Sequence, residues 1–495
     1  MYETEGGGFP WVARWPKVPA YEIAKRIMER HDFAKDANGR LYRYLSGVYL
    51  DDGEEFAKRM CKEVLAEAEL LESWSSHKAA EVAEFIRVDA RPLLQRPDRN
   101  RLTVANGILH LDTMELMPHR PSYAVTVRLP IVYDPKAKCP SWLRFAQDWF
   151  GEEGPTFVPE TAAWLMTPDL SLQKALLLLG EGGEGKSRFL AGLRAFLGGS
   201  NVSTIALHQL EEDRFKAARL QGKLANFYAD LPSTYLQSTS LFKSLVAGDA
   251  ITGEQKFRES FDFQPFARLV FSANTPPRSA DASSAFFSRW IVVRFKRRFR
   301  DEADQVSPQE IDRLLADPTE RAGLLNLALA ALPRLRQRGF TITAAMQEAY
   351  NEFVEATDPF TVWLNARTVE DAEAFTPCSE LMAAYRDYAL EHSLGVSVTR
   401  VAIGNALRRA RPRVRYAQKA VAGKTMWSYI GIMLRKESHD SRNSRTSRAF
   451  PNSSQSREET IRQRNGEESV NSVSPVTSTP SPLVAEALQQ GGRVV

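Results

Sequence analysis

The sequence has few cysteines, no long apolar run and little net charge. Its 495 residues include only three cysteines, Cys61, Cys139 and Cys378, and no CxxC spacing. This odd, scattered set argues against a disulfide framework and predicts buried, reduced thiols. No segment approaches ~18 consecutive apolar residues, which excludes a transmembrane helix. We therefore expect no membrane partner.

The remaining composition is that of a soluble globular protein. Hydrophobic residues make up 43% and charged residues 25%, enough for a sizeable core. The first residues, MYETEGGGFPWVARW, lack the basic-then-apolar order of a signal peptide, so we expect the protein to stay where it is made. A net charge of +4 does not by itself indicate a nucleic-acid binder, and the distribution of charge along the chain is more informative.

The pattern of apolar residues divides the chain into four parts. Residues 1–160 mix helical and strand-like segments, residues 161–338 alternate strands with helices, and residues 340–436 are largely helical with a basic end. Residues 437–495 are rich in serine, arginine and asparagine, which predicts a disordered tail. Four apolar runs in the second part predict strands of an α/β core: Lys174–Leu179, Leu224–Tyr228, Leu269–Ala273 and Ile291–Phe295.

A phosphate-binding motif follows the first of these strands. The octet fits G-x-x-x-x-G-K-[ST] and comprises Gly180, Glu181, Gly182, Gly183, Glu184, Gly185, Lys186 and Ser187. Its glycines let backbone N–H groups converge on phosphates, while Lys186 is placed for the β- and γ-phosphates and Ser187 for Mg²⁺. Because loop contacts come mostly from the backbone, we expect Glu181 and Glu184 to face solvent. The motif predicts ATP and Mg²⁺ as cofactors.

Three polar residues follow the motif at strand boundaries. Asp230 ends an apolar strand, where a P-loop protein holds Mg²⁺, although strand-end aspartates are common. Asn274 ends another strand and either orients the attacking water or forms the turn before Thr275-Pro276. Arg289 precedes a strand, and is either a solvated arginine or an arginine finger for a neighbouring subunit.

Together these residues resemble a superfamily III helicase, and more narrowly the helicase part of the phage/plasmid primase-helicases related to the poxvirus ATPase. The order is Walker A at Gly180–Ser187, Walker B ending at Asp230, an intermediate box at Phe242–Asp249, sensor Asn274 and finger Arg289. The segment Asn106–Leu111 resembles the family's N-terminal helicase region. Asp358-Pro359-Phe360 resembles the start of its winged-helix region. The resemblance covers roughly residues 30–434.

The resemblance implies a P-loop AAA+-like core, preceded by an α+β N-terminal helicase region and followed by a winged-helix domain and a disordered tail. It also implies a homohexameric ring that acts on single-stranded and duplex DNA in the cytoplasm of a bacterial host. A separate primase and other replication proteins are further candidate partners.

The chain departs from the family pattern in three ways. Walker B has the single acid Asp230, so that residue serves two roles or the catalytic base lies elsewhere. Glu184 stands where the family often has asparagine. Few residues precede the helicase region, so we expect no priming activity.

Two basic segments are candidates for DNA contact. The intermediate box, with Lys243, leads into a hairpin that carries Lys256 and Arg258 and contacts DNA in this family. From His392 to Lys436 there is no acidic residue. That stretch predicts a winged-helix surface that binds DNA through basic residues, and the candidates are Arg408, Arg409, Arg411, Arg413 and Arg415.

We therefore predict an ATP-dependent DNA helicase of a phage, prophage or plasmid replication system. Catalysis is assigned to Lys186, Asp230, Asn274 and Arg289. One alternative is an ATP-switched origin-binding or assembly protein with weak turnover, since Walker B has a single acid. Another is a motor that translocates on RNA.

Overall fold

The protein is described from a computed structural model. The structure describes residues 18–232, 236–254, 260–277, 279, 281, 283–296, 306–392, 398–421 and 424–435. Lys256, Arg258, the side chain of Arg409 and the predicted tail at 437–495 lie outside the described residues. Within that described part, no helix is both long and apolar enough to cross a membrane.

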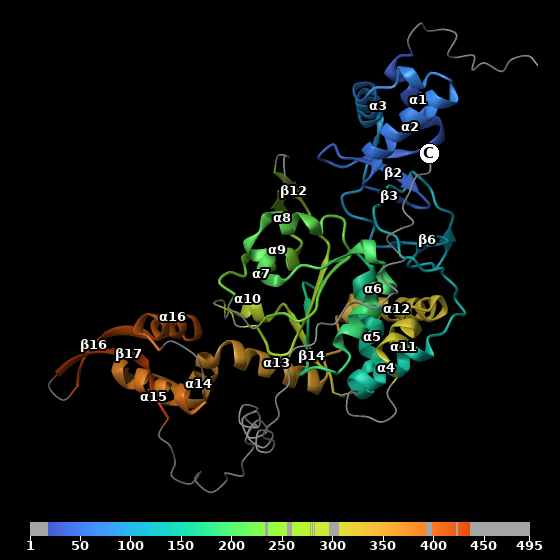
Figure 1. The fold of residues 1–495 in the computed structure, drawn as a ribbon. Coiled ribbons are helices and arrows are strands. Elements are labelled where there is room, and N and C mark those ends of the chain that lie inside the picture. The colour runs from blue at the N-terminus through green and yellow to red at the C-terminus, as the bar shows by residue number, and fades with distance from the viewer. Residues whose placement is uncertain are drawn as a thin grey trace, which may run out of the picture. The chain divides into compact units, whose positions relative to one another are not determined.

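The N-terminal part combines three helices with two small sheets (Figure 1). Its helices pack around a shared apolar cluster and are α1 (Ala20–Arg30), α2 (Gly53–Glu67) and α3 (Ser76–Asp89). One sheet has the order β3-β2-β1-β4, with β1 (Phe33–Lys35), β2 (Leu41–Leu45), β3 (Val48–Leu50) and β4 (Arg91–Pro92). The other is β5 (Arg101–Val104), β6 (Gly107–His110) and β7 (Leu116–Met117).

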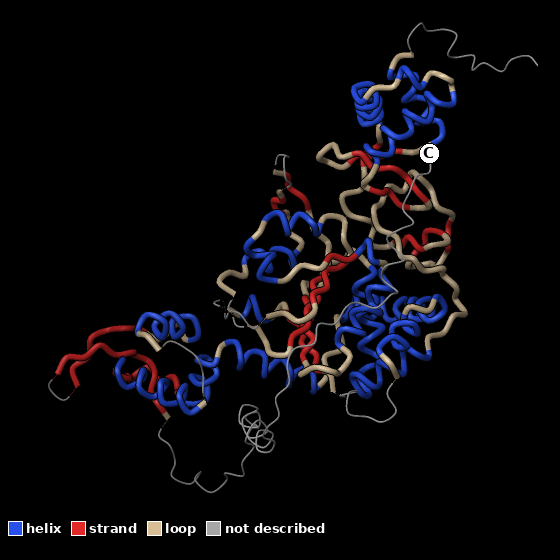
Figure 2. The backbone as a smooth tube through the Cα atoms, in the orientation of Figure 1, coloured by secondary structure: helices blue, strands red, loops and turns tan. Residues whose placement is uncertain are grey.

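A five-stranded parallel sheet forms the centre of the chain (Figure 2). Its strands are β8 (Ala175–Leu179), β9 (Val202–Ser203), β10 (Ala225–Tyr228), β13 (Arg268–Ala273) and β14 (Trp290–Arg294). Their order is β14-β8-β13-β10-β9, and every pair is parallel. The four predicted strands are confirmed. Strand β9 was not predicted, because two residues give no pattern.

Both faces of this sheet are covered by helices, which explains the uninterrupted apolar run in β8. Successive strand residues point to opposite faces, so Leu176 and Leu178 join one apolar cluster while Leu177 and Leu179 join another. The first cluster receives α4 (Pro140–Phe150), α5 (Gly154–Met166), α6 (Lys186–Leu197), α11 (Pro308–Leu315) and α12 (Pro318–Arg338). The second receives α7 (Leu207–Glu212), α9 (Ser240–Ala247), α10 (Ser284–Phe287) and α13 (Ala344–Thr357).

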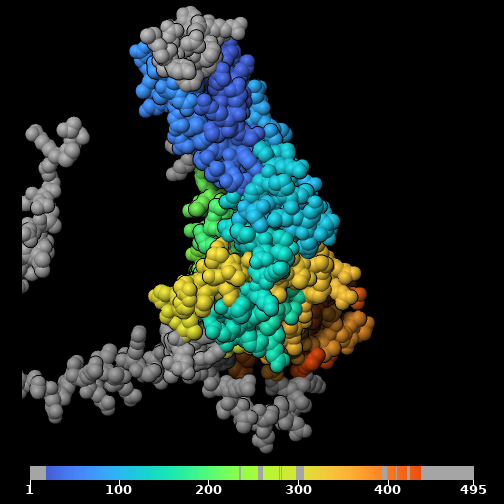
Figure 3. Space-filling model, turned by 90° about the vertical axis from the view of Figure 1, so that its right-hand side faces the viewer, coloured from blue at the N-terminus to red at the C-terminus, as the bar shows by residue number. Residues whose placement is uncertain are grey.

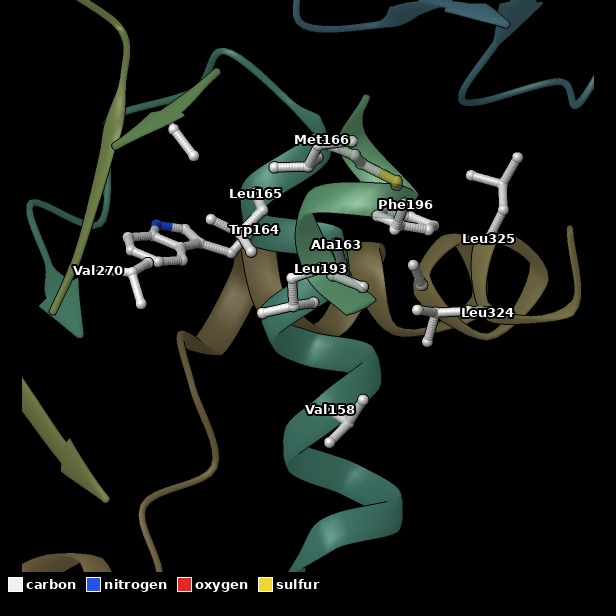
Figure 4. Packing of buried hydrophobic residues seen from close by; sticks show 14 of the residues in the cluster. Val158, Ala163, Trp164, Leu165, Met166, Leu193, Phe196, Val270, Leu324 and Leu325 are labelled. Carbon is white, nitrogen blue, oxygen red and sulfur yellow. The ribbon is translucent and has the colours of Figure 1, made fainter. Parts of the chain in front are cut away.

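Helices from before and after the sheet strands meet in the first cluster. Side chains of α5, α6, α12 and β13 converge there, among them Trp164, Phe196, Leu324 and Val270 (Figure 4). In the space-filling view the teal of α4 and α5 is continuous with the yellow of α11 and α12 (Figure 3). The predicted domain boundary at residue 160 thus falls within α5.

The C-terminal part alternates helices with an antiparallel sheet. Its elements are α14 (Pro359–Arg367), β15 (Thr368–Pro377), α15 (Cys378–Glu391), α16 (Arg400–Ala410), β16 (Arg415–Val421) and β17 (Lys424–Leu434). The sheet order is β15-β17-β16, and the helices pack on it through residues such as Trp363, Leu381 and Leu407. The pattern of residues 340–436 predicted a largely helical domain. Strand β15 was not predicted; it carries three acids and pairs with β17 only at its two ends.

Candidate nucleotide site

The glycine-rich octet forms a turn between β8 and α6, as its motif predicts. Gly182, Gly183 and Gly185 have φ values of +121°, +78° and +93°, which side-chain-bearing residues rarely adopt. Gly185 is the N-cap of α6, so the helix begins at Lys186. The octet therefore brings backbone N–H groups and the positive end of a helix to one place, which suits a phosphate chain.

Lys186 lies at the centre of this site. Its side chain is buried, and its Nζ donates to the Gly180 carbonyl oxygen at 2.5 Å and to Asn274 Oδ1 at 3.2 Å. Two predicted catalytic residues are thus brought together.

Glu184 is turned inward, contrary to the expectation that it faces solvent. It is only 6% exposed, and its Oε2 lies 3.5 Å from Lys186 Nζ. A Cβ placed on Gly180 would lie 1.7 Å from the same oxygen, so the carboxylate is folded back over the start of the turn. A buried carboxylate needs a cation within reach, and Lys186 provides it. Glu181, in contrast, is exposed as predicted.

Asp230 lies beyond the end of β10, next to the end of β13. Its backbone N–H donates to Ser272 Oγ at 3.3 Å, and the N–H of Leu231 donates to the Ser272 carbonyl oxygen at 2.7 Å. The backbone of Asp230 has φ +62°, a left-handed conformation that aspartate tolerates better than most residues. Its side chain is exposed.

The glycine-rich octet (hereafter the P-loop), Asn274 and Asp230 therefore lie together at the carboxyl end of the sheet strands. They follow the adjacent strands β8, β13 and β10, which are spaced about 4.8 Å apart. Ser187 is exposed in the first turn of α6. The described residues contain no cluster of three or more histidine, cysteine or acidic side chains that could hold a metal. Mg²⁺ commonly uses one or two protein ligands together with phosphates and water, so Ser187 and Asp230 fit its requirements.

Arg289 lies at the opposite, amino end of the sheet strands, just before β14. Its carbonyl oxygen accepts from the N–H of Ala175, the first residue of β8, at 2.7 Å. The P-loop begins after the last residue of that strand, about 16 Å further on. An arginine side chain cannot span that distance. The structure does not bring Arg289 to the P-loop of its own chain.

Trp149 of α4, which was not predicted as a site residue, packs against the glycine-rich turn. It is fully buried and stacks on Phe145, with ring centroids 5.6 Å apart. A Cβ on Gly185 would lie 2.3 Å from Trp149 Nε1, so this indole closes off the space beside the turn. The spacing of Trp142, Phe145 and Trp149 is that of one apolar helix face, which was an available signal.

The predicted hairpin after the intermediate box is present. Strand β11 (Ile251–Gly253) pairs antiparallel with β12 (Phe261–Phe263), and the short helix α8 (Arg214–Ala217) lies beside β11. Lys243 of α9 pairs with Asp281 at 2.8 Å, so its charge is balanced within the chain. Burial raises the pKa of Asp281, but hydrogen bonds from Lys243, Ser283 and Thr239 outweigh burial and hold that pKa well below its ordinary value. A DNA contact by Lys243 stays a prediction.

The predicted basic residues of the C-terminal part differ in their surroundings. Arg408, Arg413 and Arg415 are exposed. Arg411 instead pairs with Glu370 of β15 at 2.8 Å and donates to Asn365 Oδ1 at 2.5 Å. The buried thiols predicted for all three cysteines are present, and burial raises the pKa of Cys61 to about 11 and of Cys139 to about 12.

Two protein-family models match the chain. Residues 178–289, from the P-loop strand to Arg289, match a family of unknown function, DUF5906. Residues 21–151 match the family described as D5 N terminal like. This match confirms the resemblance to the phage-type primase-helicase family. The D5 N-terminal-like region comprises α1 to α4 and the two small sheets.

The chain is also similar to solved structures of the NrS-1 C-terminal region. "The A form apo structure of NrS-1 C terminal region-CTR" and "The apo structure of NrS-1 C terminal region (305-718)" are each 11% identical to this chain. Each match has a TM-score of 0.49 and covers 84% of this chain and 100% of that chain. A third structure of the same region has a TM-score of 0.47.

Proposed function

We propose that the protein is an ATP- and Mg²⁺-dependent DNA helicase that works as a ring, with a P-loop AAA+-like core. The observation that carries this proposal is the placement of the site residues on the parallel sheet. The P-loop, Asn274 and Asp230 lie at the carboxyl end of the strands, whereas Arg289 lies at the amino end. A site built in this way is complete only when a second subunit supplies its arginine.

Each residue has a chemical role in this site. The backbone of Gly180–Gly185 and the ammonium of Lys186 would hold the β- and γ-phosphates, and Glu184 would turn away to admit them. Ser187 and Asp230 would hold Mg²⁺, which neutralises charge on the phosphate oxygens. Asn274 would orient the attacking water, and Arg289 of a neighbouring subunit would stabilise the charge that develops on the transferred phosphoryl group.

The topology of the chain supports both proposed domains. In chain order the sheet strands are arranged 5-1-4-3-2, with the P-loop after the first strand. The C-terminal order α14-β15-α15-α16-β16-β17, with the sheet order β15-β17-β16, fits a winged helix whose last two strands are the wing. The basic residues of that unit suit single-stranded and duplex DNA. Replication of a phage, prophage or plasmid in a bacterial cytoplasm, together with a separate primase, is the proposed setting.

ATP turnover with and without single-stranded DNA tests this function. We expect DNA to stimulate ATP turnover in the wild type. Lys186→Ala and Asp230→Ala should each lower ATP turnover at least about a hundredfold, because each removes a charge that acts on the phosphates or the metal. The matched control is Lys62→Ala, an exposed lysine of α2 in the N-terminal part. Absence of wild-type turnover despite ATP binding would contradict the helicase.

One observation favours a second candidate, an ATP-switched binding or assembly protein. Asp230 is the single acid at the end of β10, and the other acid near Lys186, Glu184, is engaged by that lysine. The switch predicts tight ATP binding and oligomerisation with little hydrolysis. Stimulation by RNA and not by DNA would instead indicate an RNA motor.

A further inference from the structure

The wing of the C-terminal unit exposes two aromatic rings. Strands β16 and β17 pair with Tyr416 opposite Tyr429 and Gln418 opposite Trp427. Because side chains alternate along a strand, Tyr416, Trp427 and Tyr429 project from the same face of the sheet. Tyr429 is buried, but Tyr416 is 41% exposed and Trp427 is 45% exposed. The row of rings thus begins in the core and ends in solvent.

The two exposed rings are stacked on each other. The centroids of Tyr416 and Trp427 are 4.9 Å apart and their planes differ by 11°. Tyr416 also contacts Tyr429, with centroids 5.1 Å apart, and Tyr429 lies 3.9 Å from Cys378 Sγ. The pair is therefore held in place by contacts with the core, and its rings are ordered before any partner binds. Preorganised rings lose little conformational entropy when a planar group stacks on them.

On the two strands that carry this pair, and on α16, every charged residue is basic. Residues 398–421 and 424–435 contain no aspartate or glutamate. Arg400 of α16 acts electrostatically on Tyr416 and Tyr429, and Arg415 and Lys419 are exposed on β16, on the face opposite to the rings. On the neighbouring strand β15, Glu370 is paired with Arg411.

Flat apolar rings beside unbalanced positive charge match a partner that offers both planar bases and phosphates. Single-stranded nucleic acid does so, because its bases present free π faces. Duplex DNA keeps its bases stacked within the helix and offers the wing only phosphates. An apolar protein surface would use the rings but not the charge.

We propose that Tyr416 and Trp427 form a base-stacking platform that holds single-stranded DNA on the wing. This inference rests on the proposed action on DNA. It extends that action because the contacts predicted for the basic residues are to phosphates only, whereas the platform contacts bases. The platform would grip a separated strand in preference to the duplex, and Arg400 would contact a phosphate beside the stacked base.

The test compares two oligonucleotides that differ only in their bases. Full-length protein without nucleotide is titrated into fluorescently labelled oligo-dT and into an abasic oligonucleotide of equal length, and anisotropy gives each Kd. We expect the wild type to prefer oligo-dT. In Trp427→Ala that preference should shrink by about tenfold, a typical loss for one base–aromatic stack. Trp427→Phe should keep most of it.

Gln418→Ala provides the matched control, because Gln418 is exposed and directly opposite Trp427. It should leave both Kd values unchanged. An unchanged preference in Trp427→Ala, or an equal loss of affinity for both oligonucleotides and for blunt duplex, would overturn the platform. A changed oligomeric state without a changed preference would assign the rings to a second copy of the chain and would also overturn it.

This assay separates the platform from the motor, because it requires no ATP turnover. If Trp427→Ala binds both oligonucleotides as the wild type does while DNA still stimulates ATP turnover, the platform fails and the helicase stands. If the preference is lost in Trp427→Ala but the wild type hydrolyses no ATP, the helicase fails and the platform stands.

Discussion

At the scale of single residues, the carboxylate of Glu184 lies where it would compete with the proposed phosphate chain. It is buried 3.5 Å from the Lys186 ammonium, the group that the phosphates need. We expect Glu184→Gln to tighten ATP binding about fivefold or more, because removing a like charge a few ångströms away is worth at least ~1 kcal/mol. Isothermal titration calorimetry would measure the change in Kd.

Glu181→Gln is the control for this change, since it removes the same charge from an exposed position of the same turn. It should alter Kd much less. Equal tightening in both variants would indicate that the overall negative charge of the loop matters and not the position of Glu184. No tightening in Glu184→Gln would refute the competition between Glu184 and ATP.

The glycines of the turn differ in what surrounds them. An alanine Cβ at position 185 would lie 2.3 Å from Trp149 Nε1, whereas nothing lies within 4 Å of one at position 182. Both positions have positive φ, which costs alanine roughly 1–3 kcal/mol. We therefore expect Gly185→Ala to abolish ATP binding and Gly182→Ala to weaken it partially, as measured by calorimetry. Equal effects would show that backbone strain alone matters.

The residues that sequence reasoning found are those whose backbone or strand position determines their role. Gly182, Gly185 and Lys186 follow from the motif, because only certain residues tolerate that turn. The inward rotation of Glu184 and the contact of Trp149 could not be predicted, because both depend on which side chains the fold brings near the turn.

At the scale of secondary-structure elements, Asp281 fastens α9 to the segment before α10. It accepts hydrogen bonds from Thr239, the N-cap residue of α9, at 2.5 Å and from Lys243 at 2.8 Å. Its folded-state pKa lies below the ordinary value of 3.8, so its contribution to stability is complete above that pH and is lost as the pH falls. We expect Asp281→Asn to lower Tm at pH 7, with the difference from wild type shrinking below about pH 4.

Glu310→Gln is the control for Asp281→Asn. Glu310 also pairs with a cation, Arg313 at 2.7 Å, but that pair is on the surface within α11. Exposed pairs contribute little, so Tm should not change at either pH. A difference for Asp281→Asn that persists unchanged at pH 3 would argue against the titration of this carboxylate.

Long apolar or periodic elements were predicted well, and short or polar ones were not. The strands β8, β13 and β14 read as apolar runs because both faces of the sheet are covered. Strand β15 carries Glu370, Asp371 and Glu373, and exists because its two ends pair with β17. Tertiary contacts decide such a strand, so its own sequence does not reveal it.

At the scale of the whole molecule, local sequence patterns predicted that Asp230 and Asn274 follow strands, but they did not predict the order of those strands in the sheet. That order makes β10 and β13 neighbours and brings both residues close to the P-loop at the carboxyl end of the strands. Arg289 lies at the amino end. Strand order depends on pairings between distant segments, which local patterns do not encode.

The position of Arg289 leads to a prediction about subunit mixing. If its guanidinium acts on the phosphates of a neighbouring subunit, Lys186→Ala and Arg289→Ala will each be inactive alone. A mixed ring, however, contains interfaces at which an intact P-loop meets an intact arginine. We expect an equimolar mixture to recover about a quarter of wild-type ATP turnover if subunits mix at random and each interface acts independently. Arg313→Ala, an exposed arginine paired within its own helix, should keep full activity alone. Failure of the mixture to recover, under conditions in which labelled subunits exchange, would contradict the action of Arg289 on a neighbouring subunit.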